Sequence, residues 1–272
     1  MAVDRELVDR LKRLLGRLVH ARKLTGDRWE REMDSISAEI DKLPQVGLLE
    51  ALDAAVGRSA PRRDASLYIL GTLADVPEAM ARMADALSHP DPELRRLALS
   101  AIEDHEWRQL APRLNRMILE DPDELCRREA IRVAGVLKED VNWPIILQLA
   151  RSAHPDLAWT LKDYGREEGR PYLESAFKRA ESKGDRVIAA WGLAKLGDLA
   201  ALKFVGKMLY DPVIRTPTFS DVGESLRAAQ AMADIFDLPF EWNRSSVEPI
   251  RQWWEAHKRE ALRGHRWWRW WR

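Results

Sequence analysis

A short pattern recurs along this chain about every thirty residues. Its clearest copies read DPELRRLAL from Asp91, DELCRREAI from Asp123 and DRVIAAWGLA from Asp185. Six copies can be aligned on the arginine. The aligned position is occupied by Arg63, Arg95, Arg127, Ala158, Arg186 and Arg227. The steps between these residues are 32, 32, 31, 28 and 41 residues. A fixed period in this range is typical of a solenoid, in which one supersecondary unit stacks on the next.

Each copy is predicted to be a pair of helices, A and B. In the turns at 89–92, 121–123 and 154–156 a proline ends helix A, and the aspartate after it is placed to accept hydrogen bonds from the first amides of helix B. Helix A carries apolar residues at helical spacing, as in Met80, Met83, Ala84 and Leu87. We therefore expect helix B to start at an aspartate in each copy and to carry the Arg-x-x-Ala pattern.

Two further helices are expected before the repeats, over residues 4–23 and 27–43. The first has a leucine stripe at three- and four-residue steps, and the second stops before Pro44. No segment alternates with period two over a useful length, so strands are not expected. The predicted fold is all-α: an α-solenoid of about six helix pairs, with N-terminal helices at 1–44, the repeat array at 45–262 and a basic tail at 263–272.

The copy at 185–198, DRVIAAWGLAKLGD, resembles the HEAT-like repeats of bacterial phycobilin lyases. The resemblance covers roughly residues 45–262 and departs from the repeat pattern at Ala158 and at the 41-residue step. It implies an α–α superhelix in which the repeat arginine bonds to neighbouring repeats. The segment DLPFEW at 237–242, with the aromatic helix after it, resembles the closing segment of such arrays, which implies that Trp242, Trp253 and Trp254 form a C-terminal cap.

Charge is balanced overall but divided along the chain. Residues 251–272 carry seven Lys and Arg against two acidic residues, whereas the other 250 residues carry 37 basic and 42 acidic ones. The acidic balance of the body argues against nucleic acid as its partner. The single cysteine, Cys126, is expected to be a buried, reduced thiol. The sequence has no signal-peptide pattern and no long apolar run, so we expect a cytoplasmic protein.

Motifs for catalysis are absent from the sequence. There is no Gly-x-x-x-x-Gly-Lys-Ser/Thr loop, no Gly-x-Gly-x-x-Gly and no Gly-x-Ser-x-Gly. We expect no metal and no cofactor, and a non-catalytic scaffold or adaptor that binds a protein partner on its concave face. The resemblance leaves two enzyme alternatives: a phycobilin-lyase-like protein, and a nucleic-acid-binding or DNA-glycosylase-like protein. The second would use a cationic face supplied by these residues: Arg96, Arg128, Arg132, Lys162 and Lys195.

The B helices are expected to line the concave face through the first and fifth positions after the repeat arginine. The candidate partner-binding residues at these positions are Arg96, Arg128, Arg132, Trp159, Asp163 and Trp191. Trp159 and Trp191 lie 32 residues apart in successive copies, and we expect them to be neighbours. They could belong to a binding face or to the core between repeats.

Two departures from the repeat remain. Residues 211–222 are expected to form a long loop. The tail, RGHRWWRWWR at 263–272, combines tryptophan with arginine, and its candidate contact residues are Arg266, Trp267, Trp268, Arg269, Trp270 and Trp271. Four interpretations stay open for the tail: packing back on the array, docking to a protein partner, peripheral contact with an anionic membrane, or contact with single-stranded nucleic acid.

Overall fold

The computed structural model describes residues 4–44, 47–73, 76–151, 157–211, 223–241 and 244–263. Within these ranges the chain is all-α and contains no strand. The α-helices are α1 (Arg5–Ala21), α2 (Asp27–Ile40), α3 (Leu48–Val56), α4 (Ala60–Leu70), α5 (Pro77–Ala86), α6 (Pro92–Asp104), α7 (Ala111–Glu120), α8 (Glu124–Leu137), α9 (Trp143–Arg151), α10 (Leu157–Tyr164), α11 (Arg170–Arg179), α12 (Lys183–Lys195), α13 (Leu199–Met208), α14 (Glu224–Phe236) and α15 (Val247–Ala261). Short 3₁₀ turns lie at Arg108–Leu110, Glu167–Gly169 and Arg244–Ser246.

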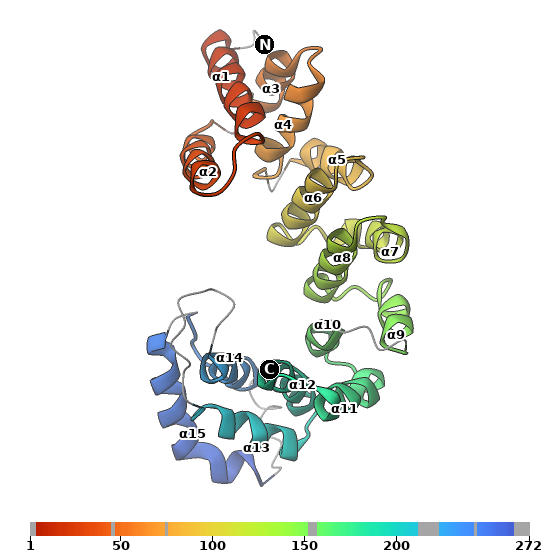
Figure 1. Cartoon of the computed structure of the whole chain (residues 1–272), viewed down its shortest axis with the longest axis vertical. Coiled ribbons are helices and arrows are strands. Elements are labelled where there is room, and N and C mark those ends of the chain that lie inside the picture. The colour runs from red at the N-terminus through yellow and green to blue at the C-terminus, as the bar shows by residue number, and fades with distance from the viewer. Residues whose placement is uncertain are drawn as a thin grey trace. The chain divides into compact units, whose positions relative to one another are not determined.

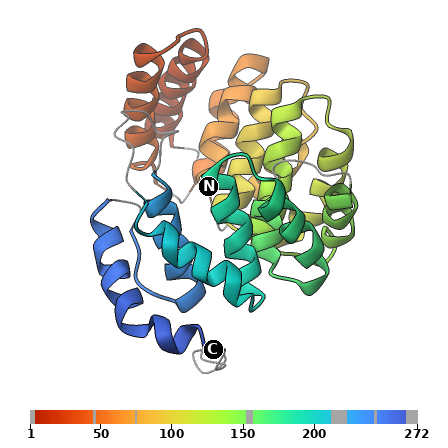
Figure 2. The same ribbon diagram turned by 60° about the horizontal axis from the view of Figure 1, so that its bottom comes forward.

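The helices group into two units, residues 1–133 and residues 134–272, and the boundary in the sequence falls within α8. In the N-terminal unit, α1 packs on α2, α3 and α4, and α5 packs on both α4 and α6. In the C-terminal unit, α12 is central and contacts α10, α11, α13 and α14, while α15 covers α14. Figures 1 and 2 show these neighbouring helices, which include the consecutive pairs from α3 to α6 and from α9 to α15.

The B helices start at one register. The helices α4, α6, α8, α12 and α14 each begin three residues before their aligned arginine, so the residue before each helix always lies four positions ahead of that arginine. Asp91 accepts from the Glu93 amide at 2.9 Å, and Asp123 accepts from the Cys126 amide at 2.9 Å. Because these carboxylates satisfy amides that have no helical partner, the local sequence determines where the helix begins.

The prediction that an aspartate starts helix B was wrong in three copies. The residue before α4 is Ser59 and the residue before α14 is Gly223, and neither makes a side-chain cap bond. In the copy at Arg186 the cap is Ser182, whose hydroxyl accepts from the Asp185 amide at 3.0 Å, and not Asp185 itself. Asp185 lies in the first turn of α12 and its carboxylate accepts from the Ser182 hydroxyl at 2.6 Å. Ser182 and Asp185 therefore form a capping box, and the offset of four residues between cap and arginine is preserved.

The aligned arginines make a recurring hydrogen bond. Arg95 donates to the carbonyl of His89, Arg127 to that of Asp121 and Arg186 to that of Ala180, in each case six residues back. The acceptor carbonyls belong to the turn between helix A and helix B, where no helical amide is available to them. The arginine therefore ties the turn to its own helix B.

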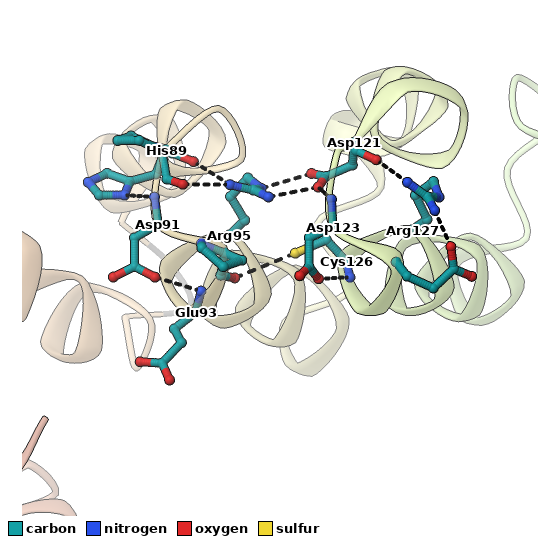
Figure 3. A network of polar contacts seen from close by, with 11 residues as sticks. His89, Asp91, Glu93, Arg95, Asp121, Asp123, Cys126 and Arg127 are labelled. Carbon is teal, nitrogen blue, oxygen red and sulfur yellow. Dashed lines mark hydrogen bonds and ion pairs between the residues drawn. The ribbon is translucent and has the colours of Figure 1, made fainter.

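Figure 3 shows how this bond continues from one copy to the next. The guanidinium of Arg95 also makes two hydrogen bonds to the Asp121 carboxylate, at 2.8 and 2.7 Å, and both side chains are buried. Asp121 belongs to the turn that precedes α8, and its carbonyl accepts from Arg127. Since Cys126 Sγ also lies 3.5 Å from the Pro92 carbonyl, α6 and α8 are joined by both polar and close packing contacts.

The leading helices follow the predicted pattern. Asp4 caps α1, and the leucine stripe is buried from Leu7 to Leu18. The second predicted helix is shorter than expected: α2 ends at Ile40, and residues 41–43 form a turn before Pro44. The apolar stripe of α1 packs against α3 and α4, so the N-terminal helices share a core with the first repeat.

At the other end, α15 covers the last helix pair with aromatic side chains. The Trp254 indole is buried against Gly206 of α13, where any side-chain Cβ would overlap its ring. Trp253 lies 4.6 Å from Phe236 and 4.7 Å from His257 between ring centroids. Two of the three predicted cap tryptophans thus pack on the preceding helices, and Trp242 lies outside the described residues.

Several other predicted features also lie outside the described residues. They are the turn residues 154–156, the predicted loop after Asp211 and the tail from residue 264 onward, with Arg266, Trp267, Trp268, Arg269, Trp270 and Trp271. Cys126 lies in the described part and is fully buried, as predicted. None of the described helices is long and apolar enough to cross a membrane.

Candidate functional site

The C-terminal unit brings Trp159 of α10 and Trp191 of α12 together. Their ring centroids lie 5.8 Å apart with an interplanar angle of 69°, an edge-to-face pair, so the predicted neighbourhood is confirmed. The two helices approach closely because residue 192 is glycine: a Cβ there would lie 2.9 Å from the Leu173 side chain and 3.3 Å from Lys162 Cα. The repeat register and this glycine together position the two rings.

Lys162 lies beside the pair and is buried, at 5% exposure. Its ammonium lies 3.8 Å from the Trp191 ring centroid and 4.8 Å from that of Trp159, and Nζ donates to Asp163 Oδ1 at 2.5 Å. Burial lowers the pKa of Lys162, and the charge and hydrogen bond of Asp163 oppose this shift only in part. The two rings and the carboxylate together stabilise one ammonium group.

Asp234 of α14 joins the pair from the next helix. Its Oδ2 accepts from the Trp191 indole at 2.7 Å and from Lys195 at 2.9 Å. Partial burial alone would raise the pKa of Asp234, but the bonds and charges of Lys195 and Trp191 outweigh it and the pKa is lowered. The carboxylate is therefore ionised at neutral pH and holds the Trp191 ring in place.

We name these residues the tryptophan–lysine cluster: Trp159, Lys162, Asp163, Trp191, Lys195 and Asp234. The exposed fractions of its charged side chains are 6% for Lys162, 23% for Lys195, 24% for Asp163 and 41% for Asp234. Trp191 is buried at 3%, whereas Trp159 is partly exposed. The carboxylates are thus at least as exposed as the ammonium groups, and Trp159 is the aromatic surface that a partner can reach.

Sequence reasoning overlooked the role of Lys162, although a signal was present. Lys162 lies four residues after Ala158, and the equivalent positions of the other copies hold only buried apolar residues: Leu67, Leu99, Ile131, Ala190 and Ala231. A lysine at a core position of a repeat requires a charge partner and an aromatic or polar environment. Comparing copies column by column would have singled it out.

The other three predicted binding residues lie in the N-terminal unit, on α6 and α8. Arg132 and Arg128 are exposed, and Arg132 pairs with Glu103. Arg96 is half-buried, and its Nε has no hydrogen-bond partner within the described residues. Of the six predicted residues, the structure brings Trp159, Asp163 and Trp191 into one cluster.

A cavity of about 470 Å³ also lies in the N-terminal unit, between α5 and α7. Its charged lining residues are already paired: Arg95 with Asp121, Arg113 with Asp85 and Arg116 with Glu120. Such pairing leaves few groups to converge on a ligand. The described residues also contain no group of three metal-ligating side chains.

The tryptophan–lysine cluster offers binding chemistry. Its titratable groups are two lysines and two aspartates that neutralise each other pairwise, and it contains no hydroxyl or thiol nucleophile beside a base. Its partly exposed indole on a rigid helix is the type of anchor that dominates protein interfaces. No protein-family model matches the chain, and no characterised protein matches it significantly.

Proposed function

We propose that the chain is a HEAT-like α-solenoid that acts as a non-catalytic scaffold or adaptor. The common start of five B helices supports a repeated structural unit, as does the arginine bond that recurs in three copies. Such arrays commonly present an extended face for binding. In this proposal the B helices form that face, and the single cysteine, a buried thiol, supports a cytoplasmic location.

The protein partner binds the face of α10, α12 and α14, with Trp159 at its centre. The observation that carries this proposal is the packing of Trp159 against Trp191 and Lys162, which orders an indole without burying it completely. A pre-ordered aromatic side chain loses little entropy on binding and contributes strongly to affinity. The basic tail, with Trp267 and Trp268, is proposed as a second contact, either with the partner or with an anionic membrane.

The nucleic-acid alternative has less support. A phosphate-binding face would need several cations free to release counterions. Among the cations considered for that face, Arg132 pairs with Glu103, Lys162 with Asp163 and Lys195 with Asp234. The lyase-like alternative has no support beyond the resemblance of the repeats.

Co-purification from the native cell tests the adaptor proposal. A protein that co-purifies with the wild-type chain should be lost from Trp159→Ala and retained by Trp29→Ala, because Trp29 is an exposed tryptophan of α2, at 43%, outside the cluster. Retention by both variants would show that Trp159 is not the anchor. Salt-sensitive DNA binding at sub-micromolar affinity that survives deletion of residues 263–272 would instead favour the nucleic-acid alternative.

A further inference from the structure

We infer that the tryptophan–lysine cluster captures an arginine side chain from a basic segment of the protein partner. This inference rests on the proposed function and adds the chemistry that the partner must carry. It is argued from the cation that the cluster already holds, from the exposure of its charges and from the shape of the guanidinium group.

The cluster already holds a cation. The Lys162 ammonium lies over both indole rings and donates to Asp163, so the site combines the aromatic and carboxylate contacts that stabilise a positive group away from water. Trp191 is buried beneath this ammonium, whereas Trp159 keeps part of its surface exposed. A second cation can therefore approach Trp159 from the solvent.

The accessible charge of the cluster is negative. Lys162 uses only Oδ1 of Asp163, while Trp191 and Lys195 use only Oδ2 of Asp234. Among the described residues, neither Asp163 Oδ2 nor Asp234 Oδ1 accepts a hydrogen bond, and the two side chains are 24% and 41% exposed. Each of these two oxygens, one on α10 and one on α14, can accept a donor from a partner.

The local charges of the cluster favour a basic partner segment over an acidic one. The whole chain is neutral, so the preference comes from the partly exposed carboxylates of Asp163 and Asp234 and not from net charge. The resident lysines repel a basic segment little, because each is bound to a carboxylate. An acidic segment would instead meet the two free carboxylate oxygens.

Arginine fits this arrangement better than lysine does. Its planar guanidinium stacks on an indole face and still directs N–H groups sideways to carboxylate oxygens, which an ammonium cannot do from one position. It is also more weakly hydrated, so less solvation is lost when it reaches a partly buried site. We therefore expect discrimination between arginine and lysine peptides of equal charge.

Fluorescence anisotropy with labelled octapeptides tests the inference on the full-length chain in 0.15 M salt. The (Gly-Arg)₄ peptide should bind at least five-fold more tightly than (Gly-Lys)₄, and (Gly-Glu)₄ should show no saturable binding. Trp159→Ala and Asp163→Asn should each weaken (Gly-Arg)₄ binding at least five-fold. Asp163→Asn keeps the side-chain volume and retains Trp159, so the two variants test the carboxylate and the indole separately.

Asp85→Asn is the matched control, because Asp85 is 83% exposed and belongs to the N-terminal unit. It removes the same charge, so it should leave the dissociation constant within two-fold. Equal weakening by Asp85→Asn and Asp163→Asn would reduce the effect to net charge and overturn the inference, as would equal affinity for the arginine and glutamate peptides. Binding that appears only after deletion of residues 263–272 would assign the site to the chain's own basic tail and would also overturn it.

Failure of this inference can be told apart from failure of the proposed function. If a native partner is captured through Trp159 but excess (Gly-Arg)₄ does not displace it, the scaffold proposal stands and the arginine inference is wrong. If no partner depends on Trp159, the proposed function itself fails.

Discussion

At the scale of single residues, Lys162 shows how a charge can occupy a core position. Its aliphatic stem fills the space that leucine or alanine fills in the other copies, and its ammonium reaches the two indoles and Asp163. Desolvation of the charge is offset by cation–π contact and by the carboxylate, so the net contribution to stability is expected to be small. The proposed binding face would explain the lysine better than the stability of the fold does.

Replacing Lys162 by methionine tests this view. Methionine has a similar volume, and its sulfur can contact the two indole rings in place of the ammonium. Asp163 stays partly solvated without its partner. The free energy of unfolding should therefore change by less than about 1 kcal/mol. Leu99→Ala, at the equivalent position of α6, should lower it by about 2–5 kcal/mol because it leaves a cavity. Urea denaturation compares the two variants, and a loss above about 3 kcal/mol in Lys162→Met would show that the charge stabilises the fold.

Cys126 gives a second residue-scale prediction, which concerns pH. Burial raises the pKa of this thiol to about 11 from an ordinary value of 9.0. Between those values the unfolded thiol loses its proton while the folded one keeps it, so stability should fall as pH rises. From pH 8 to pH 10 the free energy of unfolding should fall by roughly 1 kcal/mol more in wild type than in Cys126→Ala. Identical pH slopes in urea denaturation would contradict the prediction.

At the scale of elements, the repeat arginine has one local role and one that varies between copies. Arg95, Arg127 and Arg186 all tie a turn to its helix, but Arg95 alone among them bonds with a buried aspartate, Asp121. The bond to Asp121 joins α6 to the turn before α8. Arginines at the same position of the repeat are therefore expected to contribute differently to the free energy of unfolding.

Arg95→Met and Arg127→Met measure that difference in matched positions. Arg95→Met leaves Asp121 buried without its partner and should lower the free energy of unfolding by about 3–5 kcal/mol. Arg127 is partly exposed and pairs with the exposed Glu124, so its loss should cost only about 1 kcal/mol. Equal costs in chemical denaturation would show that the Asp121 contact contributes little.

Glycine packing gives an element-scale prediction at the C-terminal cap. In Gly206→Ala the new methyl would overlap the Trp254 indole, and the shift of α15 should cost about 1–3 kcal/mol. The control is Gly16→Ala in α1, where a Cβ meets nothing within 4 Å and should stabilise by about 0.5–1 kcal/mol. Hydrogen exchange should become faster in α13 and α15 of Gly206→Ala; unchanged exchange there would mean that Trp254 does not depend on the glycine.

At the scale of the whole molecule, the described helices close the proposed array without the basic tail. Trp253, Trp254 and Ile250 of α15 already pack on the last helices. Deleting residues 263–272 should therefore leave the helical circular dichroism unchanged and the melting temperature within about 2 °C. A much larger fall in melting temperature would show that the tail belongs to the core.

The sequence predicted the features that depend on contacts near in the chain. Asp91, Asp123 and Ser182 each cap a B helix four residues before the arginine, and the mistaken cap at Asp185 was displaced by only three residues. The Trp159–Trp191 pair could also be predicted, because residues one repeat period apart in the sequence lie next to each other in a stacked array. Periodicity and capping are local properties, so no tertiary information was needed.

Only the tertiary structure decided which side chains complete the site. The bond from Trp191 to Asp234 spans 43 residues across the irregular 41-residue step, where the period no longer predicts register. Likewise, the placement of Lys162 over two indoles depends on the closeness that Gly192 allows between α10 and α12. Period and capping thus determined the helices and their order, whereas the cluster depends on side-chain distances between helices, which only packing in three dimensions establishes.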